Sequence, residues 1–579
     1  MVMLYLLCIF SPFSVTAPPA HPFVEGRQDF VFQIQDNHIG HATGDVLRQF
    51  ADETRLGSAL STTTMDGREF LRAKDGRPVA SIDEWGYSAI KLSGTEIDGA
   101  GLPRAGFPCF SSLQGCEDPT TREEALARLK SYYAARQAHQ APENAYVISM
   151  NGHYYFQHYA GEWGADLLMS EVGENINGTQ AHIAFTRGAA RQFRSPWGMD
   201  MSAWYGAGVN DYWAEEDRVW CQQRNADGAC AVWHSGPDHG HSISLFERIY
   251  FTSYMAGAHY LKAEAGSINL VASKHPPAAL SPLGEMARDF HAFTQAHPDR
   301  GTPYVPYAII LDYHHGLGLG SWYKPAGEEK AFEVLPMGDA DRCTLQLLEA
   351  FWPNAFRVQG GDESQYLVPT PFGDTSDVLL ENAPVEAFLA YDFLFLSGDI
   401  EAASELTERL KAFLGTGKTI VLSPNHGAIF STLDAGPANP IGALPPTVAI
   451  QSPAHGGTII ELMDAAQWPA LLKHLHQTAQ PFSFTGDPIH YLLNRRGDTW
   501  IITLINDLGI TKQPKSAAVV DPAQRATVTL SSTSARITSC TKINEVPMAL
   551  KPLSPSGQTL QLKPGQIAVL MVEVASGSS

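Results

Sequence analysis

The feature that most constrains the fold is an alternation of short apolar segments and helical patterns between residues 163 and 266. Three apolar segments lie at 166–173, 197–204 and 259–266, and helical patterns at 179–193 and 244–258 separate them. Strands that alternate with helices predict a parallel sheet, and this many units favours a closed (β/α)8, TIM-like barrel. The chain is therefore expected to be an α/β protein.

Three regions follow from the pattern along the chain. Residues 21–302 form the expected barrel domain, with further strands predicted at 30–35, 89–94 and 145–152 and a helix at 122–137. Residues 303–484 restart the alternation with YAIILDYHHG, which predicts a flavodoxin-like α/β domain. Residues 485–579 contain only strand patterns, such as TWIITLIND, and predict a C-terminal β-sandwich.

The N-terminal segment and the cysteines both indicate export. Residues 1–20 contain an apolar run of signal-peptide length followed by small residues and prolines, although a buried first strand is the alternative. Cys109 and Cys116, and likewise Cys221 and Cys230, bracket polar loops that disulfides can close. Cys343 and Cys540 are then left to pair with each other or to stay as free buried thiols. We expect a secreted or periplasmic protein.

The charge excludes two classes of partner. The chain has 61 acidic and 40 basic residues, a formal net charge of −21. Such a protein repels nucleic acid and anionic membranes, so neither is expected as a partner. Outside the N-terminal segment, no stretch reaches the roughly 18 uninterrupted apolar residues that a membrane span needs.

Acidic residues stand at or just past the ends of the three apolar segments. They are Glu171 and Glu174, Asp200, and Glu264. Chemistry in a (β/α) barrel takes place at the carboxyl ends of its strands, and a pair of carboxylates is what glycoside hydrolysis requires. We predict Glu171 or Glu174 as the acid and Glu264 as the opposing carboxylate, which Lys262 on the same strand face holds ionised. A salt bridge or a helix cap is the structural alternative for each glutamate.

Residues near these acids are candidates for binding a sugar. Aromatic rings stack on pyranose faces, and imidazoles hydrogen-bond to hydroxyls. The predicted binding residues are Asp200, Trp204, Tyr205, His153, His241 and Asp312. Asp200 alternates with two methionines and is expected to point into the barrel. The alternative for the aromatic side chains is an ordinary place in the hydrophobic core.

The order of these parts resembles a known group of enzymes. A barrel with glutamates at its strand ends, the helix AFTRGAARQF followed by PWG, a flavodoxin-like domain and a β-rich domain are similar to the family forty-two β-galactosidases of glycoside hydrolase clan A. The resemblance implies a retaining hydrolase with two barrel glutamates, no cofactor, and a homo-oligomer formed through the flavodoxin-like domain. The Asn-Glu pair typical of the clan is absent, and Glu174-Asn175 has the reverse order.

Three functions are consistent with the sequence. The first is a secreted glycoside hydrolase that cleaves O-glycosidic bonds of a poly- or oligosaccharide. The second is a carbohydrate-binding barrel without catalysis, which the missing Asn-Glu pair favours. The third is a metal-assisted hydrolase or lyase that uses the loop with His234, His239 and His241. Of these, the sequence favours the glycoside hydrolase without a metal ion.

Overall fold

The structure is a computed structural model, and it describes most of the chain. The described residues are 31–34, 62–65, 68–73, 75–82, 85–90, 107–150, 154–173, 178–218, 220–273, 275, 279–316, 330–353, 362–433, 439–440, 448–451, 456–533, 536–544, 548–549 and 557–575. The predicted signal peptide, residues 1–20, lies outside them, as do Glu174 and His153.

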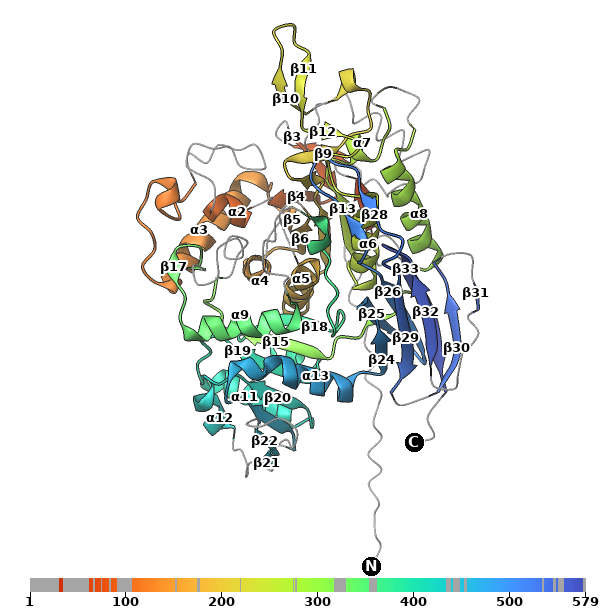
Figure 1. The fold of residues 1–579 in the computed structure, drawn as a ribbon. Helices are drawn as coiled ribbons and strands as arrows, with labels where there is room; N and C mark the ends of the chain where they lie inside the picture. The colour runs from red at the N-terminus through yellow and green to blue at the C-terminus, as the bar shows by residue number, and fades with distance from the viewer. Residues whose placement is uncertain are drawn as a thin grey trace, which may run out of the picture.

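The largest sheet has eight strands in the order β1-β13-β7-β6-β5-β4-β3-β2. These strands are β1 (Val31–Ile34), β2 (Thr62–Met65), β3 (Arg68–Arg72), β4 (Pro78–Ile82), β5 (Tyr146–Ser149), β6 (Leu167–Val172), β7 (Trp197–Met201) and β13 (Tyr260–Ala263). All pairs from β4 through β13 to β1 are parallel, and the pairs among β2, β3 and β4 are antiparallel. The described chain is therefore an α/β fold with a curled, mostly parallel sheet (Figure 1).

The two faces of this sheet carry different residues. One face bears a small apolar core made of alternate strand residues, among them Ile148, Met169 and Tyr260. The other face, with Met199 and Met201, packs into the main core beneath the helices. Those helices are α3 (Arg122–Gln140), α4 (Tyr155–Glu162), α5 (Thr179–Phe193), α6 (Ile243–Met255) and α8 (Pro282–Ala296). Asp200 alternates with the two methionines, so it lies on the face away from the helices, as predicted.

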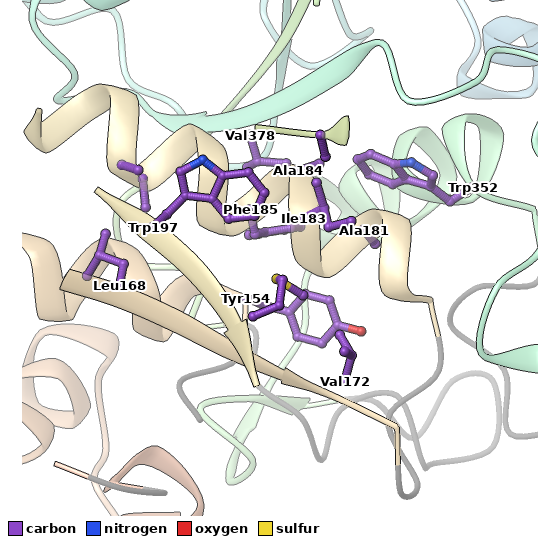
Figure 2. Close-up of a cluster of buried hydrophobic side chains, with 14 of the residues drawn as sticks. Tyr154, Leu168, Val172, Ala181, Ile183, Ala184, Phe185, Trp197, Trp352 and Val378 are labelled. Atoms are coloured by element: carbon purple, nitrogen blue, oxygen red, sulfur yellow. The ribbon is translucent and has the colours of Figure 1, made fainter. Parts of the chain in front are cut away.

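Helix α5 joins this sheet to the second one. Figure 2 shows its Ile183, Ala184 and Phe185 between Leu168 of β6 and Val378 of the second sheet. A Cβ atom at Gly188 would overlap the backbone of Val378, so only glycine allows this close approach. Arg187 of the same helix forms buried ion pairs with Asp374 and Asp377 that fix the junction further.

The second sheet has seven strands in the order β18-β15-β19-β20-β23-β22-β21. They are β15 (Tyr307–Leu311), β18 (Ser376–Leu380), β19 (Phe393–Ser397), β20 (Thr419–Leu422), β21 (Asn439–Pro440), β22 (Val448–Gln451) and β23 (Thr458–Glu461). Its helices include α9 (Asp339–Phe351), α10 (Val385–Phe388), α11 (Ser404–Leu414), α12 (Gly427–Thr432) and α13 (Trp468–Ala479). The first five strands are parallel, and in chain order they run 2-1-3-4-5, the order of flavodoxin-like sheets.

The C-terminal residues form two antiparallel sheets on a shared core. The first contains β14 (Thr302–Pro303), β25 (His490–Arg496), β26 (Thr499–Ile505), β33 (Ile567–Val574), β30 (Ile537–Lys542) and β31 (Met548–Ala549). The second contains β24 (Phe482–Gly486), β29 (Ala526–Ser532) and β32 (Gln558–Leu562). Side chains of both sheets, such as Leu530 and Leu570, meet in one apolar cluster, which is the arrangement of a β-sandwich.

Several local predictions can be checked directly. The predicted strand at 89–94 is wrong where the structure describes it, because Ala89 and Ile90 belong to helix α2 (Trp85–Ile90). A short apolar run fits a buried helix as well as a strand, and periodicity alone does not separate them. The disulfides Cys109–Cys116 and Cys221–Cys230 are confirmed. Cys343 and Cys540 are free thiols, as in the second of the two alternatives, but Cys540 is buried and Cys343 is only half-buried.

No helix among the described residues has both the length and the apolar character required to cross a lipid bilayer.

Candidate functional site

The carboxyl ends of β6, β7 and β13 lie side by side and carry the predicted acids. Glu171 of β6 is the register partner of Asp200 on β7, which is in turn the partner of Lys262 on β13. Partners in neighbouring parallel strands point to the same face, so these three side chains form one row. Each is at most 4% exposed. The structure thus brings two predicted acids and a cation together on one buried face.

Asp200 and Lys262 form an ion pair within this row. The Lys262 Nζ atom lies 2.8 Å from Asp200 Oδ2 and 3.0 Å from the sulfur of Met150, just past β5. We expected Lys262 to hold Glu264 ionised, and the structure pairs it with Asp200. Its strand face was predicted correctly, but the neighbour across the sheet depends on register, which the sequence of one strand does not contain.

Glu264 follows directly after β13 and is held by the end of β7. Its backbone N–H donates to Met201 at 3.1 Å. Its carboxylate accepts hydrogen bonds from the Ser202 hydroxyl at 3.0 Å and from the Ala203 N–H at 3.1 Å. Hydrogen bonds from neutral donors to a carboxylate are charge-assisted and stabilise its negative form. Glu264 is therefore a positioned, 6% exposed carboxylate at the strand edge.

Gly173 brings the end of β6 close to this group. Its φ of +94° is a left-handed conformation that L side chains rarely adopt. A Cβ atom there would lie 3.1 Å from the carbonyl oxygen of Ser202 and 3.3 Å from His241 Nε2. Gly173 therefore lies next to Ser202, which holds Glu264, and next to the His241 ring.

Tyr205 and His241, which are both predicted to bind a sugar, are in contact. Their rings stack with centroids 4.7 Å apart, and Tyr366 meets His241 edge-on at 4.9 Å. His241 Nδ1 lies 3.7 Å from the buried carboxylate of Glu363. Burial lowers the pKa of His241 although Glu363 opposes this shift, so the imidazole is neutral near pH 7.

Glu363 is a residue that the sequence analysis missed. It accepts hydrogen bonds from the N–H and hydroxyl of Ser242, the residue that caps α6. Burial raises its pKa, but the nearby His241 ring and the hydrogen bonds from Ser242 outweigh that effect, and the net shift is downward. The motif GDESQY carries no signal of this role, because the contact joins residues about 120 positions apart.

Trp204 lies shortly after the end of β7, next to Ser202 and Ala203 in the chain. It begins β8 (Trp204–Tyr205) and meets Trp220 edge-on with ring centroids 5.0 Å apart. Both rings are partly exposed and pack on a cluster that contains Ala203 and Ala265. Those alanines flank Ser202 and Glu264 in the chain. The tryptophans therefore border the carboxyl ends of β6, β7 and β13, which form the candidate catalytic edge.

Asp312 lies in a separate cluster at the end of β15, in the second sheet. Arg122 from the first turn of α3 lies 3.9 Å from it and forms a close ion pair with Asp341, which also contacts His315. Burial, together with the negative charge of Asp341, raises the pKa of Asp312 to about 7. The structure therefore does not place Asp312 in the row of Glu171 and Asp200, and its predicted contact with a sugar stays a prediction.

The histidine loop does not gather into a cluster of metal ligands among the described residues. His234 Nδ1 contacts the carbonyl of Ala207 at 2.7 Å, whereas His241 is buried against Tyr205. Within the described ranges, no group of three or more His, Cys, Asp or Glu side chains is arranged to hold a metal ion.

Comparison with known proteins yields distant structural similarities. No protein-family model and no curated protein sequence matches the chain. Among solved structures, a catalytic mutant of Gan42B, a GH42 β-galactosidase from G. stearothermophilus, has a TM-score of 0.46 and 9% identity, covering 78% of this chain and 68% of that one. A rhamnosidase from Novosphingobium sp. PP1Y has a TM-score of 0.43 and 12% identity, covering 79% and 40%. The apo exo-carrageenase GH42 from Bacteroides ovatus has a TM-score of 0.39 and 10% identity, covering 78% and 55%. At this level of similarity, the activities of these enzymes cannot be assigned to this chain.

Proposed function

We propose that this protein is a secreted glycoside hydrolase that cleaves O-glycosidic bonds of a poly- or oligosaccharide with two carboxylates. The observation that carries the proposal is the position of Glu171, Asp200 and Glu264 at the carboxyl ends of three adjacent parallel strands. In a (β/α)8 barrel this edge is where substrates bind. The parallel order from β4 through β13 to β1 and the helices on one face support part of such a barrel, whereas the antiparallel strands β2 and β3 depart from it.

The two glutamates have different surroundings and therefore different proposed roles. Glu264 accepts hydrogen bonds from Ser202 and Ala203 that stabilise its negative charge, which suits the nucleophile. Glu171 is the acid: it gives its proton to the glycosidic oxygen while Glu264 bonds to the anomeric carbon and the leaving alcohol departs. Glu171 then takes a proton from a water molecule, whose oxygen displaces Glu264 and releases the sugar.

The spacing of the strands is compatible with two carboxylates acting on one bond. Only β7 separates β6 from β13, so their backbones lie roughly 10 Å apart at this edge. Glutamate side chains that point inward from both strands shorten this separation. Retaining enzymes hold the two carboxyl groups about 5 Å apart and inverting enzymes hold them about 6.5–9.5 Å apart, and we propose the retaining course.

The remaining residues of the edge would bind the sugar. The Asp200–Lys262 pair supplies an acceptor and a cation for hydroxyl groups next to Glu171. The neutral imidazole of His241 both donates and accepts hydrogen bonds. Trp204, partly exposed beside the Glu264 strand end, offers an aromatic face to the apolar face of a pyranose.

Export of the protein is supported by its disulfides. Cys109–Cys116 and Cys221–Cys230 close two loops, and such bonds persist in oxidising compartments. Together with the apolar segment at residues 1–20, they support a substrate outside the cytosol.

The test is a screen of the intact protein for release of reducing ends from neutral galactan, xylan and mannan. Neutral polymers are chosen because a protein of charge −21 repels polyanions. The proposal expects release from at least one polymer, and loss of that release in Glu264→Gln but not in the exposed control Glu408→Gln. EDTA should leave the rate unchanged; an EDTA-sensitive rate would favour the metal-assisted alternative. Binding without release by the wild type would favour the non-catalytic one.

A further inference from the structure

A disulfide-closed hairpin projects from the carboxyl edge of the first sheet. Strands β10 (Cys221–Arg224) and β11 (Cys230–Trp233) pair antiparallel, and Cys221–Cys230 closes them. Figure 1 shows the hairpin extending beyond the rest of the molecule, above β9, β12 and α7 (Gly266–Asn269). A covalent closure in so exposed a hairpin keeps its shape defined without an apolar core.

The base of the hairpin is attached to the candidate catalytic edge. A small sheet of β8, β9 (Gly208–Asn210) and β12 (Ser235–Gly236) continues from the end of β7. The Trp220 carbonyl accepts the N–H of His234 at 3.2 Å, and the Ser235 hydroxyl donates to Asp211 at 3.1 Å. These bonds connect the hairpin to the small sheet that follows the end of β7.

Three partly exposed tryptophans lie at that edge and at the base of the hairpin. Trp204 and Trp220 meet edge-on at 5.0 Å. At the end of β11, the Trp233 ring is covered by Arg218 at 5.6 Å, and its Nε1–H donates to Glu215 at 3.0 Å. Aromatic rings fixed in this way by neighbours lose little freedom when a ligand stacks on them.

The hairpin also offers polar groups suited to hydroxyls. Gln222, Gln223, Arg224 and Asn225 are all exposed, and amide side chains both donate and accept hydrogen bonds. Trp213, in the cluster beneath Trp204 and Trp220, is 3% exposed, and its Nε1–H has no hydrogen-bond partner within the described residues. A buried donor without an acceptor has a cost that a ligand oxygen would remove.

We propose that Trp204, Trp220, Trp233 and the exposed face of the β10–β11 hairpin form an extended binding surface for a neutral polysaccharide. The surface holds sugar units beyond the bond that is cleaved, so the substrate is a polymer rather than a disaccharide. Its role in delivering a chain to Glu264 rests on the proposed function, whereas the binding itself is measured separately.

The experiment is native affinity electrophoresis in gels containing galactan, xylan or mannan. Full-length Glu264→Gln is the parent, so that no polymer is degraded during the run. We expect at least one polymer to retard it, and expect Trp220→Ala or Trp233→Ala to weaken that affinity at least about tenfold, equivalent to about 1.4 kcal/mol. Trp233→Phe, which keeps the aromatic face and loses the bond to Glu215, should retain most of the affinity. Met463→Ala, an exposed apolar residue of the second sheet region, is the control.

Three outcomes overturn the inference. The first is equal retardation of the alanine variants and their parent, and the second is no retardation by any of the three polymers. The third is a shift from dimer to monomer in Trp233→Ala by light scattering without loss of polymer binding, which would make the hairpin a contact between copies. Tryptophan-dependent binding by a wild type that releases no reducing ends would leave the surface in place and reject the proposed hydrolysis.

Discussion

The ammonium group of Lys262 lies 2.8 Å from the carboxylate of Asp200, and both side chains are buried on the inner face of the sheet. A buried charge is tolerated because its partner is present, and removing one member leaves the other uncompensated. This pair therefore fixes the row in which Glu171 stands, and it connects the stability of the fold to the proposed site.

Removal of the cation alone should destabilise the protein strongly. We expect Lys262→Met to lower the free energy of unfolding by about 3–5 kcal/mol, because the Asp200 carboxylate stays buried without its counter-ion. The double variant Lys262→Met/Asp200→Leu should recover much of the loss. Urea unfolding measures both, with Lys411→Met, which breaks a partly exposed pair with Glu408, as the control. A loss below about 1 kcal/mol in Lys262→Met would show that the pair does not act as described.

The hydroxyl of Ser202 should matter for catalysis more than for stability. Ser202→Ala removes a hydroxyl that donates to the Glu264 carboxylate, and we expect kcat/KM on the cleaved polymer to fall about tenfold or more. Ser202→Thr keeps the hydroxyl and should retain more activity than the alanine variant. Equal rates for the wild type and Ser202→Ala would mean that this hydrogen bond does not position a catalytic group.

Asp312 should make stability fall as the pH rises. Its pKa is raised from 3.8 to about 7 by burial and by Asp341, so between these values the folded state binds a proton that the unfolded state has lost. Its contribution is complete below pH 4 and is lost as the pH rises through 7, at no more than about 1.4 kcal/mol per pH unit. Asp312→Asn does not titrate, so its stability relative to the wild type should increase from pH 4 to pH 8 in urea unfolding. A pH-independent difference between the two proteins would contradict the raised pKa.

Gly188 should not tolerate a side chain. A methyl group there would overlap the Val378 backbone across the α5–β18 junction, and overpacking of this kind costs about 1–3 kcal/mol. Gly188→Ala should therefore lower the midpoint of thermal unfolding, whereas Gly427→Ala, where a Cβ would meet no atom within 4 Å, should not. Similar midpoints for both variants would contradict the close packing of α5 on β18 at Gly188.

The parts that the sequence predicted well depend on local periodicity. Helix α5 has the predicted bounds, Thr179–Phe193, and the face of Asp200 follows from its alternation with Met199 and Met201. The parts that it missed depend on contacts between distant segments. Glu363 meets His241 only through tertiary packing, and the partner of Lys262 is decided by the register of β13 against β7. The short run at Ala89 and Ile90 was ambiguous because an apolar run of that length fits both a helix and a strand.

The central claim is that Glu171 and Glu264 are the two carboxylates of one hydrolytic site. The most direct measurement is the rate of reducing-end release by Glu171→Gln and Glu264→Gln on the polymer that the wild type cleaves, with native folding of each variant verified by circular dichroism. The account predicts that each variant loses at least about a thousandfold in kcat, because each removes a group that acts on the reacting bond. A folded Glu264→Gln or Glu171→Gln that cleaves the polymer at the wild-type rate would contradict it.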